Sequence, residues 1–131
     1  MWNHLPAVAA LLTVGLSIWT MVLVGNARRR HGIQAPATTG QPDFERAFRV
    51  QMNTLEATVA FLPSLGLAST YWDPGWAGAL GLVWVLGRIW YALGYLQAAG
   101  RRSAGFGLAS LALFALLGGA TWGLARSLSG S

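Results

Sequence analysis

The sequence predicts an all-α integral membrane protein, an antiparallel bundle of four transmembrane helices in one domain that covers residues 1–131. Two observations carry this prediction. The chain is 54% hydrophobic and 10% charged, a composition too apolar for a soluble domain of 131 residues. Its apolar residues also gather in four runs, each long enough, at about 1.5 Å per residue, to cross about 30 Å of hydrocarbon. The runs cover residues 5–24, 48–69, 76–96 and 106–124.

The first run is expected to stay in the mature protein. It lacks the basic segment that precedes the apolar core of a signal peptide, and Arg28, Arg29 and Arg30 follow it closely. Residues 31–43, rich in Gly, Pro and Thr, are predicted to form a loop, with Asp43 as the N-cap of the second helix.

The second run begins with polar side chains. On a helix, Arg49, Asn53 and Glu56 fall on one stripe about 60° wide, whereas Gln51 points the other way. Charge within a membrane segment is costly, and polar groups on two faces need protein or ligand on each side. The pattern therefore predicts a site between subunits.

The third run carries a second polar stripe. Arg88, Tyr91 and Tyr95 fall within about 60° of arc, and Arg102 joins them if the helix continues that far. An unpaired arginine deep in a span costs about 2.5 to 3.5 kcal/mol. Arg88 is therefore expected to face a water-filled cavity or Glu56, the one carboxylate within the predicted spans, and a structural ion pair is the favoured interpretation.

The fourth run carries no charged residue. Gly119 and Gly123 lie four residues apart, a spacing that lets helices approach closely. This pair is assigned to packing and not to function.

The nine basic residues are all arginine, and their positions indicate topology. Three follow the first run, and Arg101 and Arg102 follow the third, whereas the turn after the second run carries only Asp73. The positive-inside rule places both arginine-bearing loops in the cytoplasm and both termini on the opposite side, with Arg126 as a lone counter-signal. The arginines form no extended patch with interleaved aromatics, so nucleic acid is not an expected partner.

Some chemistry is excluded by composition. The chain has no cysteine, so it can form neither a disulfide nor a thiolate nucleophile of its own. No pair of His or carboxylate residues has metal-ligand spacing, so no metal is expected. Sulfur chemistry would have to come from a ligand.

Two segments in the middle of the chain carry a resemblance to a known family. After ARRR, they read ATTGQPDFERAFRVQMNTLE and LVWVLGRIWYALGYLQAAGRRSAGF, and together they span Ala27 to Phe106. In order and spacing they resemble the MAPEG family, the membrane-associated proteins of eicosanoid and glutathione metabolism. The similarity is greatest to the microsomal glutathione transferase and leukotriene synthase branches.

The resemblance implies a homotrimer that binds glutathione at each subunit interface, near the cytoplasmic side of the membrane. Matched motif positions imply contacts from Arg28 and Gln51 of the neighbouring subunit. They also imply that Arg102 stabilises the glutathione thiolate and that Arg29 assists the second substrate. The contacts implied on the first subunit are Arg49, Asn53, Glu56, Tyr91, Tyr95 and Arg102.

The expected activity is conjugation of glutathione to lipophilic electrophiles dissolved in membrane lipid, with lipid hydroperoxide reduction as a further activity. Glutathione carries two carboxylates, an ammonium and a thiol, so its site needs guanidinium groups, an acid and a thiolate stabiliser. The chain supplies that inventory. One position departs from the family: leukotriene-type members have a tyrosine directly after the motif glutamate, where this chain has Ala57.

Other interpretations stay open. Arg28, Arg29 and Arg30 can be a topology signal alone, and Tyr91 and Tyr95 can be interfacial aromatics. A non-catalytic scaffold that binds glutathione or lipid would keep the site without turnover. A small four-helix transporter is a further class, but it is expected to carry an acid in its first helix, and the first run here carries no charge.

Overall fold

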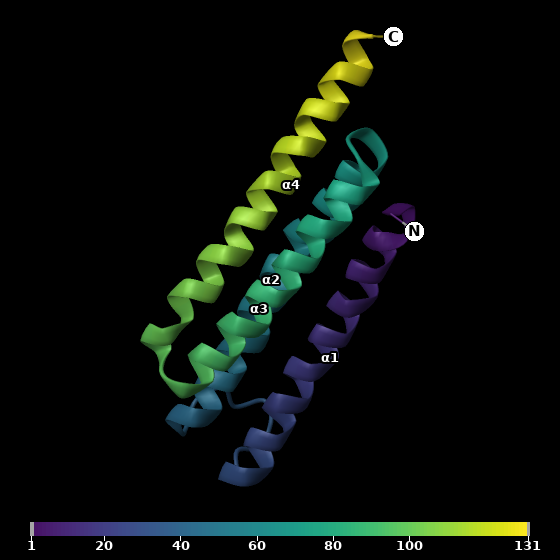
Figure 1. Cartoon of the computed structure of the whole chain (residues 1–131). Coiled ribbons are helices and arrows are strands. Elements are labelled where there is room, and N and C mark those ends of the chain that lie inside the picture. Colours follow the sequence, from purple (N-terminus) through teal and green to yellow (C-terminus); the bar gives the residue numbers. More distant parts are fainter. Residues whose placement is uncertain (1, 131) are drawn as a thin grey trace.

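Four long helices make up the chain, each antiparallel to the next (Figure 1). The computed structural model describes residues 2–130, in which no strand occurs. The all-helical prediction with four main helices is therefore confirmed. The elements are η1 Trp2–His4, α1 Leu5–His31, α2 Pro42–Tyr71, α3 Pro74–Gln97, η2 Ala99–Arg102 and α4 Ser103–Ser129.

Three helical segments are long and apolar enough to cross a membrane: Trp2–His31, Pro74–Gln97 and Ala99–Ser129. They contain α1, α3 and α4. The fourth predicted span, on α2, is not among them, because the polar cluster at its start and Glu56 lower its hydropathy. α2 nevertheless packs against all three other helices.

The start of α2 differs from the sequence expectation. The helix begins at Pro42, and the N-cap is Gln41, whose side-chain oxygen accepts a hydrogen bond from the Phe44 N–H at 3.0 Å. Proline suits the first helical position because its missing N–H would have no partner there. Asp43 lies within the first turn, so its assignment as the N-cap was wrong.

α3 ends at Gln97, so the condition under which Arg102 would share the polar stripe of α3, a helix that continues through Gly100, is not met. Arg102 lies instead at the end of η2. The turn folds tightly back onto α3, where a Cβ on Gly94 would collide with the carbonyl of Arg101. The fold-back still brings the Arg102 guanidinium to 5.5 Å from the ring centroid of Tyr95.

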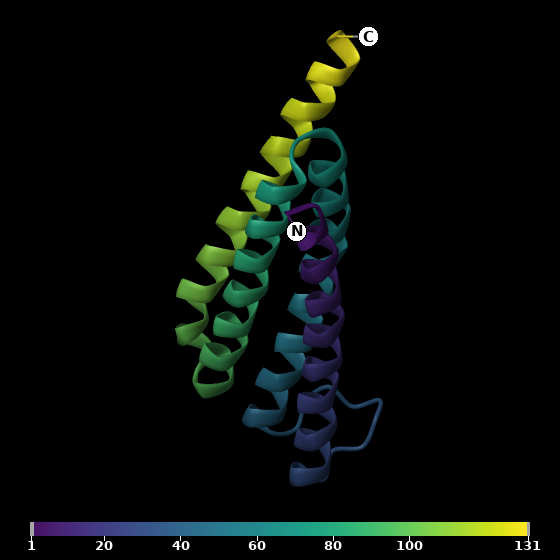
Figure 2. The same ribbon diagram turned by 45° about the vertical axis from the view of Figure 1, so that its right-hand side comes forward.

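The arginine-bearing segments and the chain termini lie at opposite ends of the bundle. Both termini and the turn between α2 and α3 lie at one end, and the two arginine-bearing segments lie at the other (Figures 1 and 2). This arrangement puts both arginine clusters on one side of the bundle, as the positive-inside argument requires.

α3 and α4 approach each other closely through glycine. A Cβ on Gly105 would collide with the backbone of Tyr91, and one on Gly87 would press on the backbone of Ala109. Gly119 likewise leaves room for the indole of Trp72. The close approach at Gly105 fixes α4 against the part of α3 that carries the polar stripe.

Gly105→Ala should therefore destabilise the bundle, whereas Gly107→Ala should not. Nothing lies within 4 Å of a Cβ at Gly107, so that change gains the helix propensity of alanine without a clash. At Gly105 the added methyl forces α3 and α4 apart, an overpacking cost of about 1 to 3 kcal/mol. Thermal unfolding in detergent, followed by circular dichroism, should give a lower Tm than wild type for Gly105→Ala and no lower Tm for Gly107→Ala. Equal Tm values for the two variants would contradict the close approach.

Candidate active site

A polar pocket of about 450 Å³ opens where α2, α3 and the start of α4 meet. Four of the nine residues that the sequence assigned to the site line it: Asn53, Glu56, Tyr91 and Arg102. The full lining is Asn53, Glu56, Ala57, Arg88, Tyr91, Arg102 and Phe106.

One hydrogen bond joins the two polar stripes directly. The Asn53 side-chain amide donates to the Tyr91 hydroxyl at 2.7 Å. Tyr91 is 1% exposed, and its ring meets that of Tyr95 edge-on with centroids 5.6 Å apart. The stripes of α2 and α3 therefore face each other across the pocket.

Arg88 lines the same pocket from the bundle interior and is 3% exposed. Its Nη2 donates to the Thr54 hydroxyl at 2.9 Å, and its guanidinium lies 4.0 Å from the centroid of the Tyr91 ring. No ion pair between Arg88 and Glu56 is found in residues 2–130, so the expected pair was wrong. The partner of Arg88 is therefore the neutral hydroxyl of Thr54 and not the expected carboxylate of Glu56.

Thr54 is a polar contact that was not predicted from the sequence. It lies on the buried face of α2 with Ala47 and Val50, at the spacing of one helical stripe. A hydroxyl on an otherwise apolar buried stripe was the signal that could have pointed to it. Phe106, which borders the pocket from α4, has no comparable signal.

Arg49 and Tyr95 line a smaller neighbouring pocket of about 230 Å³. Arg46 lies there too, and its Nε donates to the Leu96 carbonyl at 3.2 Å. Because the Arg102 guanidinium lies over the Tyr95 ring, the two pockets adjoin. All six residues assigned to one subunit thus gather on one side of the chain.

The remaining assigned residues, Arg28, Arg29 and Gln51, line neither pocket. Arg28 Nη1 donates to the Ala37 carbonyl at 2.8 Å, which ties it to its own loop. Arg29 is exposed and hydrogen-bonds to Asn26, and Gln51 is half-buried. A single chain therefore does not bring these three side chains to the polar pocket.

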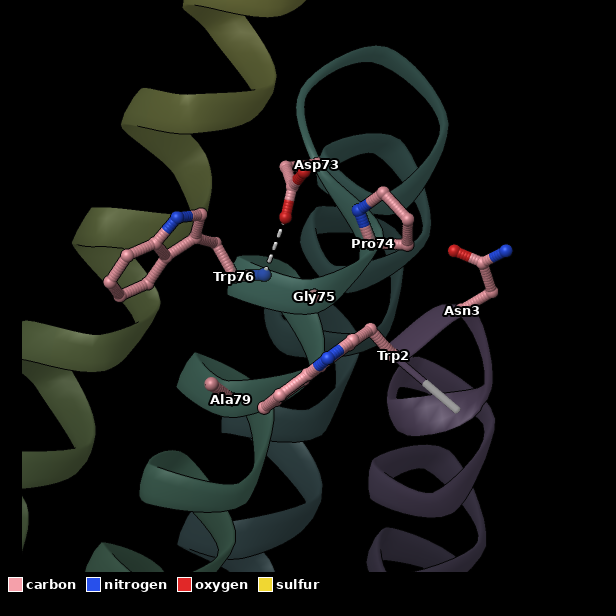
Figure 3. A pocket seen from close by; sticks show the side chains of 7 residues that line it. All are labelled: Trp2, Asn3, Asp73, Pro74, Gly75, Trp76 and Ala79. Carbon is pink, nitrogen blue, oxygen red and sulfur yellow. Dashed lines mark hydrogen bonds between the residues drawn. The ribbon is translucent and has the colours of Figure 1, made fainter.

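A hollow of about 510 Å³, larger than the polar pocket, lies at the opposite end of the bundle, where Trp2 lies across α3 beside Gly75 (Figure 3). Its one titratable lining residue is Asp73, which caps α3 by accepting the Trp76 N–H at 2.8 Å. The lining holds no cation and no general base other than this engaged carboxylate. Size alone therefore does not make it the better candidate site.

The polar pocket has the chemistry of an anion site. Arg88 and Arg102 supply two guanidinium groups, Asn53 an amide, Tyr91 a phenol and Glu56 one carboxylate. Guanidinium groups bind carboxylates and other anions through directed, charge-assisted hydrogen bonds. Within residues 2–130 no group of His, Asp and Glu side chains is placed to hold a metal ion.

The MAPEG family model matches residues 6–122, which include every residue that lines the polar pocket. The chain belongs to the MAPEG family. The resemblance seen in the two motifs is thus confirmed, and with it a membrane protein whose apolar helices suit a bilayer.

Three relatives show what this MAPEG chain is similar to. Human microsomal glutathione S-transferase 2 is 40% identical over 116 residues, which cover 87% of this chain and 79% of the relative. Leukotriene C4 synthase of Cavia porcellus is 40% identical over 120 residues, covering 92% and 80%. An uncharacterized protein of Synechocystis is 50% identical over 115 residues, covering 88% and 84%.

Proposed function

We propose that this MAPEG protein is a membrane-bound glutathione transferase that conjugates the glutathione thiolate to lipophilic electrophiles. The observation that carries the proposal is the gathering of Asn53, Glu56, Tyr91 and Arg102 around one pocket in an otherwise apolar bundle. The relatives named as a microsomal glutathione S-transferase and a leukotriene C4 synthase support it.

The proposed division of labour follows the chemistry of glutathione. Glu56 pairs with the ammonium, Arg49 binds a carboxylate, and Asn53, Tyr91 and Tyr95 supply hydrogen bonds. A free thiol with a pKa near 8.5 is only about 3% thiolate at pH 7, and a nearby guanidinium lowers that pKa.

Arg102 is the proposed thiolate stabiliser. Its side chain is exposed at the mouth of the pocket, and its Nη1 donates to the Ala99 carbonyl at 2.6 Å. The thiolate sulfur then forms a bond to the electrophilic carbon as the leaving group departs with the displaced electron pair.

Arg29 is proposed to assist the second substrate. The same thiolate could attack the distal oxygen of a lipid hydroperoxide, which breaks the O–O bond, releases the lipid alcohol and leaves a glutathione sulfenic acid. A second glutathione would reduce this product to the disulfide and water, so lipid hydroperoxide reduction belongs to this proposal as an activity of the same site.

The proposed assembly is a homotrimer with its sites at the cytoplasmic end. Arg28 and Gln51 lie outside the pocket of their own chain, and Gln51 projects from a different face of α2 than Asn53. A neighbouring subunit that contributes both residues would complete the site. This places glutathione between subunits and leaves the lipid-facing side open to an apolar co-substrate.

Anaerobic titration with glutathione in detergent tests the function. Ultraviolet absorbance of the thiolate should rise with glutathione and saturate, and the complex should turn over a generic aryl halide. Saturable binding without turnover would support the non-catalytic scaffold instead. Absence of both signals would overturn the proposal.

Subunit mixing tests the shared site. Gln51→Ala and Asn53→Ala should each abolish tight binding, because each variant damages every interface of its own trimer. A site is intact when its Asn53 comes from a Gln51→Ala subunit and its Gln51 comes from an Asn53→Ala neighbour. Random mixing of equal amounts should therefore restore about one site in four. Calorimetry of co-expressed mixtures measures the recovered sites. Binding no better than that of either variant alone would show that both residues act within one chain.

A further inference from the structure

We propose that Arg88 forms an oxyanion-binding subsite at the deep end of the polar pocket. The lipophilic co-substrate would then be one that presents an oxygen carrying, or developing, negative charge. That the molecule bound at Arg88 is a co-substrate rests on the proposed function, whereas the subsite itself can be tested by binding alone.

The first argument is the unbalanced charge of Arg88. The side chain is 3% exposed, yet no ion pair to it is found in the described part of the chain. Its Nη2 has a partner in Thr54, but its Nε is buried without one. A buried charge with an N–H that has no hydrogen-bond partner is among the most costly arrangements in a protein, and an anionic ligand would lower that cost.

The second argument is orientation. The Thr54 hydroxyl on α2 and the Tyr91 ring on α3 hold the planar guanidinium from two sides. Both partners are neutral, so they fix the group without balancing its charge. A donor group held rigidly in a water-poor site is the arrangement that binds an oxyanion well.

The third argument is position along the pocket. Arg102 lies at the arginine-bearing end of the bundle, whereas the backbone of Arg88 lies nine residues before the end of α3, about 14 Å along the helix at 1.5 Å per residue. Glutathione enters from water and meets Arg102 first. The proposal has the lipid-dissolved molecule enter at the Arg88 end, where the small side chain of Ala57 forms part of the wall.

Two kinds of molecule present the negatively charged oxygen that the Arg88 subsite would bind. In an α,β-unsaturated ketone, the thiolate sulfur bonds to the β-carbon and the π electrons move onto the carbonyl oxygen. The resulting enolate would pair with Arg88 until water protonates the α-carbon. A fatty carboxylate offers the same kind of oxygen already charged, and it therefore probes the subsite without reaction.

Calorimetric titration of the full chain in uncharged detergent decides the matter, with decanoate and decanol as probes. Arg88→Gln should weaken decanoate binding about 10- to 100-fold and leave decanol unchanged. Arg101→Gln is the matched control, since it removes the same charge from an exposed side chain that pairs with Gln97. Equal decanoate binding by Arg88→Gln and wild type, or an equal loss in Arg101→Gln, would overturn the subsite.

A second variant keeps the test decisive if Arg88→Gln folds poorly. Ala57→Phe retains the guanidinium but fills the pocket wall beside it, so it should weaken decanoate binding at least tenfold, as a blocked charge-assisted contact requires. Unchanged decanoate affinity in a folded Ala57→Phe protein would place the fatty carboxylate elsewhere.

Turnover separates the subsite from the proposed function. With glutathione, Arg88→Gln should lower kcat/KM about 10- to 100-fold for a long-chain enone, and by less than about threefold for an alkyl iodide of equal length, which has no oxygen. Equal losses on both substrates would contradict the oxyanion role. Wild-type protein that turns over neither substrate would refute the transferase function, while the decanoate titration would still decide the subsite.

Discussion

Arg102→Ala should still bind glutathione while losing the thiolate absorbance and most of its conjugation of an aryl halide. The Arg102 guanidinium is exposed at the pocket mouth over the Tyr95 ring, where it can meet a thiol bound by the other residues. A charge-assisted contact of about 1.5 to 3 kcal/mol corresponds to about ten- to a hundredfold in rate. Because the contact acts on the thiolate and is carried into the transition state, kcat should fall much more than KM rises.

The neighbouring arginine supplies the control for this prediction. Arg101 lies in the same turn and carries the same charge, but its Nη1 donates to Gln97 at 2.6 Å and it does not line the polar pocket. Arg101→Ala should therefore keep both the absorbance and the rate. Full thiolate signal and unchanged turnover in Arg102→Ala would make Arg102 a topology marker, and the thiolate role would pass to Arg49 or a tyrosine hydroxyl.

Helical periodicity was enough to predict which residues share a face. It grouped Asn53 with Glu56, and Arg88 with Tyr91, and these residues do line one pocket. It could not predict the partner of Arg88, because periodicity within one helix does not fix how that helix is rotated against its neighbour. In the structure α2 turns Thr54 towards Arg88, and Glu56 forms no ion pair with it.

Arg102 reaches the polar pocket by a route that periodicity did not predict. The sequence placed Arg102 on the stripe of α3 only if that helix continued through Gly100, whereas α3 ends at Gln97 and a turn brings Arg102 to the same pocket. The turn folds back so closely that the Arg101 carbonyl lies against Gly94, an approach that periodicity within one helix cannot predict. The helix ends differ for a related reason: apolar runs mark the part of a helix suited to lipid, and helices continue beyond it.

The half of the site assigned to a second subunit stays a prediction. Within one chain, Arg28 is tied to the Ala37 carbonyl and packs over the Phe44 ring with its guanidinium 4.8 Å from the centroid. Side-chain polarity on two faces of α2 motivates a neighbour, but a single chain supplies no contact that tests it. The subunit-mixing experiment addresses this part of the site directly.

Glu56→Gln should impair glutathione binding, or assembly of the site, because Glu56 is the only carboxylate among the residues that line the polar pocket. With Arg88 and Arg102 counted as +1 each and Glu56 as −1, the lining carries +1, and the substitution raises it to +2. Removing the one nearby carboxylate leaves the buried Arg88 charge less compensated, which is unfavourable, and the glutathione ammonium loses its proposed partner. The affinity should fall about tenfold or more, as expected for a charged hydrogen bond.

A glutathione analogue without the α-amino group makes this last prediction specific. Wild-type protein should bind the analogue more weakly than glutathione, whereas Glu56→Gln should bind the two alike, because the ammonium then has no carboxylate to recognise. Asp73→Asn is the control: it makes the same charge change at the far end of the bundle, and asparagine also caps a helix well. Glu56→Gln protein that expresses, trimerises and still prefers glutathione over the analogue would show that another group holds the ammonium, and that the pocket tolerates both arginines without this carboxylate.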